Sequence, residues 1–344
     1  MDLWVTFIGT AASVPTAARG TAATLIARGG DRFLVDCGEG TQRQLLRSGL
    51  GLVELDLILI THLHGDHYLG LPGLLKTYGL RGRTAPVRIA GPKGLTKLLE
   101  VLRPVIGRTP FPLEVTELGP GGVPWRADGA RIEAFATSHG VPSVGYALIE
   151  DDRPGMFDVA AATALGVPSG PMFGRLQRGE TVELPDGSAV RPEQVLGEPR
   201  RGRRVVLTGD TEPCAGTVQA AHGADLLVHE ATFCEDERDR ARETHHSTAR
   251  EAAEVAATAG AGLLALTHVS SRFMPRDIRA EARAVFPETV LPRDFDQVEL
   301  PFAERGGPVF HPGGARAREG AGTVSGGADA SAGTASLQEH STDL

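Results

Sequence analysis

The chain has 344 residues, of which 43 are acidic and 35 are Lys or Arg, and its formal net charge is −8. This balance argues weakly against a general nucleic-acid binder, although net charge does not fix the local potential at a binding surface. Three cysteines (Cys37, Cys214 and Cys234) are too few for a disulfide framework, and we expect neither a transmembrane helix nor a signal peptide, which together favour a cytoplasmic protein.

Four predicted strands end just before a side chain that can bind a metal ion. In chain order these are residues 55–60 before the segment 61–67, 130–137 before His139, 204–208 before Asp210, and 262–267 before His268. Taken alone, a His after a strand is more often structural than functional. Open α/β sheets, however, bind ligands at the carboxyl ends of their strands, so we expect these side chains to meet at one sheet edge.

The segment 61–67 is the densest of these. It contains His62, His64, Asp66 and His67, and the chain has only 11 His in total. Gly65 lets the backbone turn tightly among them. His nitrogen and Asp oxygen are ligands that zinc prefers, so the segment predicts a zinc site. The alternative is a surface loop that happens to be rich in His.

Three helices are predicted between the strands. They cover residues 68–80, residues 94–102, and a stretch that a capping box at Thr248–Glu251 opens and that ends at Ala259 before Gly260. The alternation of strands and helices gives an α/β fold, in one large domain or two.

Two stretches depart from this alternation. Residues 151–200 contain six prolines and frequent Gly, which predicts a long irregular connection. Such a connection is usually functional or disordered, and the alternative is a plain surface insertion. The arginine-rich residues 200–204 are compatible with a solvated turn or with an anion-binding stretch. Residues 311–344 are expected to form a disordered tail in which His311 and His340 have no role.

The motif H-x-H-x-D-H, followed by a distant His, Asp and His, resembles the metallo-β-lactamase superfamily. Further segments are similar to its ribonuclease Z branch, and the resemblance covers roughly residues 1–310. These segments are residues 7–19, residues 36–45, the His-Glu-Ala-Thr motif at 229–232, the His-Ser-Thr segment at 246–248, residues 267–273, and the Gly-Pro segment at 170–179.

The resemblance implies a four-layer αββα sandwich, with residues 1–310 as the catalytic domain and residues 154–199 as a protruding arm that binds substrate. It also implies two zinc ions per subunit, with manganese as a possible replacement. His62, His64 and His139 would hold the first ion, Asp66, His67 and His268 the second, and Asp210 would bridge them. Asp36, after the strand at 33–35, would orient the metal-binding loop without binding metal.

The implied activity is that of an endoribonuclease that removes the 3′ trailer from precursor tRNA. Hydrolysis after the discriminator nucleotide would leave a 3′-OH on the tRNA and a 5′-phosphate on the trailer. Asp66 would accept the proton of the attacking water and His246 would protonate the leaving oxygen, with Glu230 orienting His246. The alternative for His246 is a core histidine beside a helix start, and His229 is interpreted as a structural side chain near the site.

Four arginines are candidate substrate contacts. Arg272 would bind the scissile phosphate, and Arg19, Arg175 and Arg178 would contact the tRNA. Relatives form homodimers, so we expect the same here. Two other interpretations remain: a small-molecule phosphodiesterase, because the same metal core serves several ester substrates, and a non-catalytic RNA-binding member. The sequence leaves open the handling of precursors that carry CCA.

Overall fold

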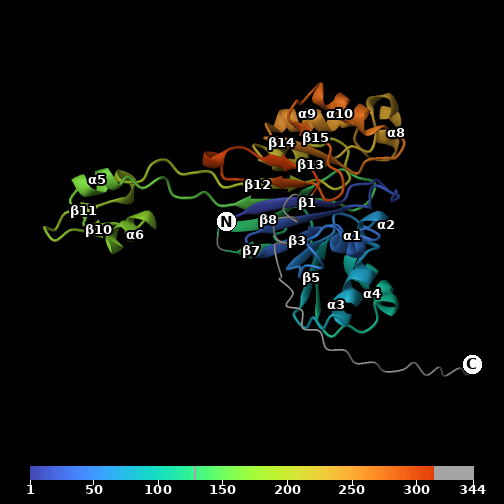
Figure 1. The fold of residues 1–344 in the computed structure, drawn as a ribbon, viewed down its shortest axis with the longest axis horizontal. Helices are drawn as coiled ribbons and strands as arrows, with labels where there is room; N and C mark the ends of the chain where they lie inside the picture. Colours follow the sequence, from blue (N-terminus) through green and yellow to red (C-terminus); the bar gives the residue numbers. More distant parts are fainter. Residues whose placement is uncertain (128, 314–344) are drawn as a thin grey trace, which may run out of the picture.

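In the computed structural model, which describes residues 1–127 and 129–313, two β-sheets face each other and helices cover their outer sides (Figure 1). The first sheet has the order β17-β16-β1-β2-β3-β4-β5-β6. Its strands are β1 (Leu3–Gly9), β2 (Ala23–Arg28), β3 (Asp31–Val35), β4 (Leu57–Leu59), β5 (Val87–Gly91), β6 (Leu113–Glu117), β16 (Gln297–Glu299) and β17 (Val309–His311). The second sheet has the order β15-β14-β13-β12-β9-β8-β7. Its strands are β7 (Trp125–Ala127), β8 (Ala130–Ala136), β9 (Val144–Glu150), β12 (Arg204–Leu207), β13 (Leu226–Glu230), β14 (Leu263–Thr267) and β15 (Thr289–Val290).

The helices form the two outer layers. The first sheet packs against α1 (Thr41–Arg47), α3 (Leu71–Leu80) and α4 (Leu95–Ile106). The second sheet packs against α7 (Ala215–Ala221), α9 (Ala249–Ala259) and α10 (Pro275–Arg283). Short helices α2 (Gly65–Tyr68) and α8 (Arg238–Glu243) lie in loops. These layers confirm the predicted αββα sandwich.

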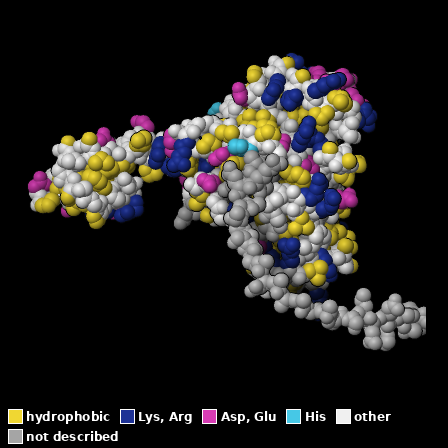
Figure 2. All heavy atoms as spheres, in the orientation of Figure 1, with side chains coloured by type: hydrophobic (Ala, Val, Ile, Leu, Met, Phe, Trp, Pro, Cys, Tyr) yellow, Lys and Arg dark blue, Asp and Glu magenta, His cyan; other side chains and the backbone are white. Residues whose placement is uncertain are grey.

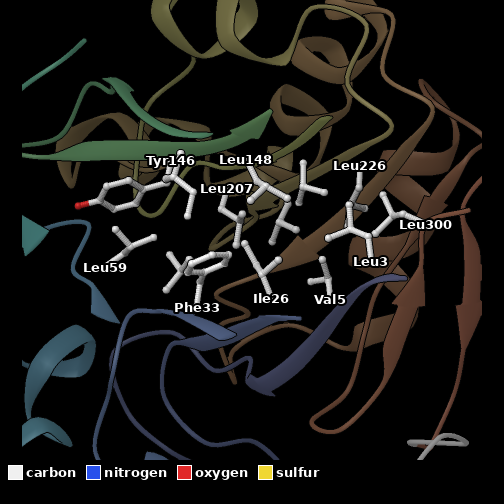
Figure 3. Close-up of a cluster of buried hydrophobic side chains, with 14 of the residues drawn as sticks. Leu3, Val5, Ile26, Phe33, Leu59, Tyr146, Leu148, Leu207, Leu226 and Leu300 are labelled. Atoms are coloured by element: carbon white, nitrogen blue, oxygen red, sulfur yellow. The ribbon is translucent and has the colours of Figure 1, made fainter. Parts of the chain in front are cut away.

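The main core lies between the sheets (Figure 3). Alternate residues of β1 and β2, such as Val5 and Ile26, point toward the second sheet, which contributes Tyr146 and Leu148 from β9. Phe33 is fully buried there, so its truncation to Ala would cost about 3–5 kcal/mol. This rigid interior fixes the strand ends that carry the candidate ligands.

Residues 151–203 form an arm that leaves the body and ends in a small folded unit (Figure 1). The unit contains α5 (Val159–Ala164), α6 (Pro171–Gln177) and a hairpin of β10 (Val182–Glu183) and β11 (Ala189–Val190). Its own apolar cluster includes Ala162, Val167, Leu176, Val182 and Val190. The expectation of an irregular connection was therefore wrong. These elements are too short for a clear periodic pattern, and a proline such as Pro171 begins a helix without interrupting it.

A clamp at the base of the arm consists of Phe302, Glu304, Arg153, Arg200 and Arg203. The guanidinium carbons of Arg153 and Arg203 lie 3.5 and 4.0 Å from the ring centroid of Phe302. Both carboxylate oxygens of Glu304 accept hydrogen bonds from Arg153, each at 2.9 Å, and Arg200 lies 3.3 Å from Glu304. The segment between β16 and β17, which carries Phe302 and Glu304, thus contacts both the outgoing and the returning segment of the arm.

Buried Glu150, at the end of β9, anchors this clamp to the body. Its carboxylate accepts hydrogen bonds from Nε of Arg28 at 2.8 Å and from Nε of Arg203 at 2.7 Å. Burial opposes ionisation of Glu150, but the two arginines outweigh it and lower its pKa. The arginine-rich stretch is neither a free turn nor an open anion site, because Arg201 also pairs with Asp225.

Several helix and tail boundaries in the structure differ from those predicted from the sequence. The helix expected at 68–80 divides into α2 and α3 at Gly70, where a Cβ would lie 2.1 Å from the carbonyl oxygen of Gly38. The capping box of Thr248 and Glu251 is confirmed, as is the left-handed Gly260 that ends α9.

The predicted tail started too early, because His311 ends β17, which pairs with β16. The remainder of that tail, residues 314–344 with His340, lies outside the described residues. Within the described part of the chain, no helix has the length and apolar character needed to cross a bilayer.

Candidate active site

The seven expected metal ligands come together at one edge of the sandwich. Potential ligand atoms form three groups, and the atoms of each group lie within 4.8 Å of one another. The first group is His62, His64, His139 and Asp210, the second is Asp66, His67 and His268, and the third, which overlaps both, is Asp210, His246 and His268. The seven expected ligands follow β4 of the first sheet and β8, β12 and β14 of the second. These three strands of the second sheet run in the same direction, because β9 is antiparallel to both β8 and β12, so their carboxyl ends lie at the same edge.

The loop after β4 is held in a fixed conformation. The backbone N–H of Thr61 donates to Oδ1 of Asp36 at 2.8 Å, and the N–H of His67 donates to the carbonyl of His64 at 3.0 Å. Gly209 lets the Asp210 loop pass close by, because it has a φ of 63° and a Cβ there would lie 2.7 Å from Cβ of Thr61.

Several ligand imidazoles have a hydrogen-bond partner on the ring nitrogen that faces away from the cluster. Nδ1 of His67 lies 2.7 Å from Oδ2 of Asp36, a contact compatible with the orienting role that the resemblance implies for Asp36. Nδ1 of His268 lies 2.8 Å from Oγ1 of Thr232, and Nδ1 of His139 lies 2.8 Å from the carbonyl of His245. Such partners fix the ring orientation and the tautomer of a metal-binding His. Sequence reasoning missed two of these partners, Thr232 and the carbonyl of His245, although Thr232 belongs to the His-Glu-Ala-Thr motif.

The electrostatics of the cluster suit divalent cations. Burial disfavours the charge of Asp210, but His268 and His67 outweigh it and hold its pKa well below the usual range. The pKa of Asp66 is lowered in the same way, against burial, by His268 and His67. Burial, reinforced by His67, keeps the pKa of His62 low, so this imidazole is neutral.

Two buried polar atoms in the cluster lack a hydrogen bond. They are Nε2 of His67 and Oδ1 of Asp210, and Oδ2 of the same Asp210 lies 3.3 Å from that nitrogen. Unpaired buried polar atoms are rare, and a ligand nitrogen beside a carboxylate is the donor set that zinc takes. The residues present therefore fit a metal site.

His246 and Glu230 form a pair beside the ligands. Nδ1 of His246 lies 2.7 Å from Oε1 of buried Glu230. Burial lowers the pKa of His246, but Glu230 outweighs it, so that the pKa rises to about 9. Its ring stacks on that of His268 with centroids 5.3 Å apart, and the ring of His139 is 5.2 Å away. His246 thus lies beside the start of α9 and also against two candidate ligands, and its role as proton donor stays a prediction.

His229 is fully buried and stands apart from the ligand groups. Its Nδ1 lies 2.8 Å from the carbonyl oxygen of Glu230, and burial lowers its pKa. This position fits the structural role expected for it.

The four candidate arginines are all engaged within the protein. Arg19 donates to Oγ1 of Thr10 and to the carbonyl of Pro292, and Arg272 makes a bidentate pair with Glu237 at 2.6 and 2.8 Å. Burial lowers the pKa of Arg19. Arg175 and Arg178, on the arm, both pair with Glu180 at 3.0 Å.

Comparison with known proteins agrees with this geometry. The profile of the Metallo-beta-lactamase superfamily matches residues 17–147, and that of the Beta-lactamase superfamily domain matches residues 185–269. Ribonuclease Z of Gemmatimonas aurantiaca is 49% identical over 308 residues, which cover 88% of this chain and 98% of that protein. Ribonuclease Z of Haloferax volcanii is 50% identical over 311 residues, covering 89% and 98%. The chain belongs to the ribonuclease Z family.

Solved structures extend the comparison. Human tRNase Z, short form, is 29% identical and superposes with a TM-score of 0.64, covering 87% of this chain and 100% of that one. YhfI from Bacillus subtilis, at 22% identity and a TM-score of 0.63, shares the fold over 87% of this chain and 99% of its own. The family and fold predicted from the sequence are confirmed, and with membership of the ribonuclease Z family the chain is a metal-dependent hydrolase.

Proposed function

We propose that this chain cuts precursor tRNA directly after the discriminator nucleotide, leaving a 3′-OH on the tRNA and a 5′-phosphate on the trailer. Processing of tRNA 3′ ends by a metal-dependent endonuclease is the activity of the family to which the chain belongs. The observation that carries the proposal is the meeting of seven His and Asp ligands beside the His246–Glu230 pair.

Two zinc ions would occupy the cluster, with manganese as a possible replacement. His62, His64 and His139 would hold one ion, Asp66, His67 and His268 the other, and Asp210 both, since Oδ2 of Asp210 lies 3.6 Å from Nε2 of His62 and 3.3 Å from Nε2 of His268. When bound, the ions neutralise phosphate charge and lower the pKa of the attacking water.

Asp66 and His246 handle the protons in this proposal. Asp66 stays ionised, and its Oδ2 also accepts the backbone N–H of Ser13 at 3.0 Å, which holds the carboxylate in place to orient the water and take up its proton. Glu230 keeps His246 protonated and fixes its ring. His246 then donates that proton to the 3′-oxygen of the discriminator as the P–O bond breaks.

The arm supports a homodimer. In Figure 1 it leaves the body at the end of the sheets opposite to α2 and α8, which flank the ligand cluster. The arm begins after β9 and returns at the start of β12, whereas Asp210 follows the other end of β12. An arm that points away from its own site serves the site of a second copy, so the functional unit is a homodimer that binds precursor tRNA. We place it in the cytoplasm.

The alternative, a small-molecule phosphodiesterase, needs no arm, so removing the arm separates the two. The backbones of Arg153 and Arg200 form an antiparallel pair with two hydrogen bonds of 2.8 Å. Replacing residues 154–199 with Asn-Gly therefore closes a two-residue hairpin at that pair and leaves the clamp in place. We expect this variant to lose pre-tRNA cleavage and to retain hydrolysis of bis(p-nitrophenyl) phosphate. Unchanged pre-tRNA cleavage would show that the arm does not bind the tRNA.

Asp66→Ala tests the cluster itself. We expect it to abolish cleavage of both substrates and to lower the metal content, because it removes a ligand and the proton acceptor. Glu114→Ala, at an exposed position of the edge strand β6, is a control outside both the cluster and the arm. Full activity of Asp66→Ala would contradict the proposal.

A further inference from the structure

A pocket of about 270 Å³ lies outside the ligand cluster. Its lining consists of Met274, Pro275, Leu291 and four arginines, Arg19, Arg276, Arg279 and Arg293. No carboxylate lines it, so four like charges face one space. We call it the arginine pocket.

The guanidinium groups of the arginine pocket are only partly neutralised. Arg19 donates to two neutral acceptors and is also attracted by the carboxylates of Asp294 and Asp296. Arg276 lies 3.3 Å from Asp277. Within residues 1–127 and 129–313, the exposed side chains of Arg279 and Arg293 have no ion pair. Guanidinium groups that gather without enough acid partners favour the binding of an anion, and a phosphate group matches their planar arrangement of donors.

Asp294, whose carboxylate attracts Arg19, already accepts several hydrogen bonds from other groups. Oδ2 of Asp294 accepts the backbone N–H of Gly20 at 2.6 Å and the amide of Gln44 at 2.5 Å, and its Oδ1 accepts the hydroxyl of Thr10 at 2.7 Å. Asp294 therefore braces the loop that carries Arg19 and compensates only part of the positive charge of the pocket.

Short connections join the arginine pocket to the active site. The N–H of Val269, next to the ligand His268, donates to the carbonyl of Thr10 at 2.9 Å. The loop from Thr10 to Arg19 also carries Ser13, whose N–H donates to Asp66. The pocket is thus lined by the loop whose Ser13 contacts Asp66, by the first part of α10 and by the segment after β15, and not by the arm.

We infer that the arginine pocket binds a backbone phosphate of the 3′ trailer, downstream of the cut. The inference rests on the proposed function. His246 protonates the discriminator oxygen, so the tRNA body leaves the site past His246. The trailer keeps the attacked phosphorus and continues past the Asp66 loop, toward the arginine pocket. Figure 2 shows basic side chains over α9 and α10, and α10 carries Arg276 and Arg279.

The test uses the full-length protein and compares KM for precursor tRNAs that differ in the length of the 3′ trailer. A triple variant, Arg276→Gln, Arg279→Gln and Arg293→Gln, removes three exposed charges and leaves Arg19 in place. A matched control, Arg81→Gln, Arg103→Gln and Arg126→Gln, removes three exposed charges elsewhere. Substrates are one pre-tRNA with a single-nucleotide trailer and the same pre-tRNA with a trailer of about ten nucleotides.

We expect the triple variant to raise KM for the long trailer roughly tenfold and to reduce the slope of log KM against log salt by about 1, with little change for the single-nucleotide trailer. The control should behave like wild type. Equal losses for both trailers would place the contact on the tRNA body, and no loss would show that the pocket binds no RNA; either overturns the inference. If wild type itself fails to cut pre-tRNA, the proposed function fails instead.

Discussion

The proposed metal site can be tested by removing one hydrogen bond, the one between Asp36 and His67. The carboxylate of Asp36 accepts from the backbone N–H and the hydroxyl of Thr61 and faces Nδ1 of His67 at 2.7 Å. Asp36 has a φ of 60°, a left-handed conformation that Asn adopts readily, so Asp36→Asn keeps the backbone unstrained. The amide oxygen can still accept from Thr61, but the amide NH₂ then faces the N–H of His67, and that bond is lost.

The expected magnitude follows from the bond that is removed. A hydrogen bond to a charged group contributes about 1.5–3 kcal/mol, which corresponds to roughly 10- to 150-fold in an equilibrium constant. We expect Asp36→Asn to weaken binding of the ion held by His67 by that factor and to leave the ion held by His62 nearly unaffected. Zinc titration of the chelator-treated protein, followed by calorimetry, measures both steps.

A matched control distinguishes local orientation from general damage. Asp56, at the other end of β4, accepts the backbone N–H of Arg32 at 2.8 Å and contacts no candidate ligand. Asp56→Asn should change stability without changing metal affinity. Unchanged zinc affinity in Asp36→Asn would refute the orienting role, and equal weakening of both ions would show that the variant disturbs the whole cluster.

Three further outcomes are expected. His246→Asn should slow pre-tRNA cleavage about 10²–10⁴-fold but spare bis(p-nitrophenyl) phosphate, whose leaving group needs no proton; equal loss on both substrates in a rate assay would contradict the acid role. Phe302→Ala should cost about 1–2 kcal/mol, the sum of two cation–π contacts, and raise KM for pre-tRNA only, whereas a small substrate that suffers equally would rule out an effect through the arm. The lowered pKa of Glu150 means that its stabilisation is present above about pH 4.3, the unfolded value, and is lost as the pH falls through the folded pKa. In thermal melts of metal-free protein, Glu150→Gln should therefore be less stable than wild type at neutral pH and converge with it in acid; a constant difference would contradict this.

The candidate ligands could be identified from the sequence because each follows a buried strand, and strands that run in the same direction place their carboxyl ends at one edge of a sheet. His139 and His268 are isolated in the sequence, yet their strand context placed them correctly at the edge that carries His62. The orienting groups could not all be found in this way. The carbonyl of His245 acts through backbone position, and any residue there would offer the same atom.

The arm shows a different limit of sequence reasoning. Its elements have two to seven residues, so neither helical nor strand periodicity can develop. The clamp joins Arg153 to Glu304, which are 151 positions apart, and nothing local marks that pairing.

Mapping the cut on a 3′-extended precursor tRNA tests the central claim most directly. The purified wild-type protein would be incubated with the precursor, with and without chelator, and both product ends identified to the nucleotide. We expect one cut directly after the discriminator, which leaves a 3′-OH on the tRNA and a 5′-phosphate on the trailer. We expect chelator to abolish this cleavage and zinc or manganese to restore it. Cleavage elsewhere, cleavage that survives chelation, or hydrolysis of small phosphodiesters alone would contradict the central claim.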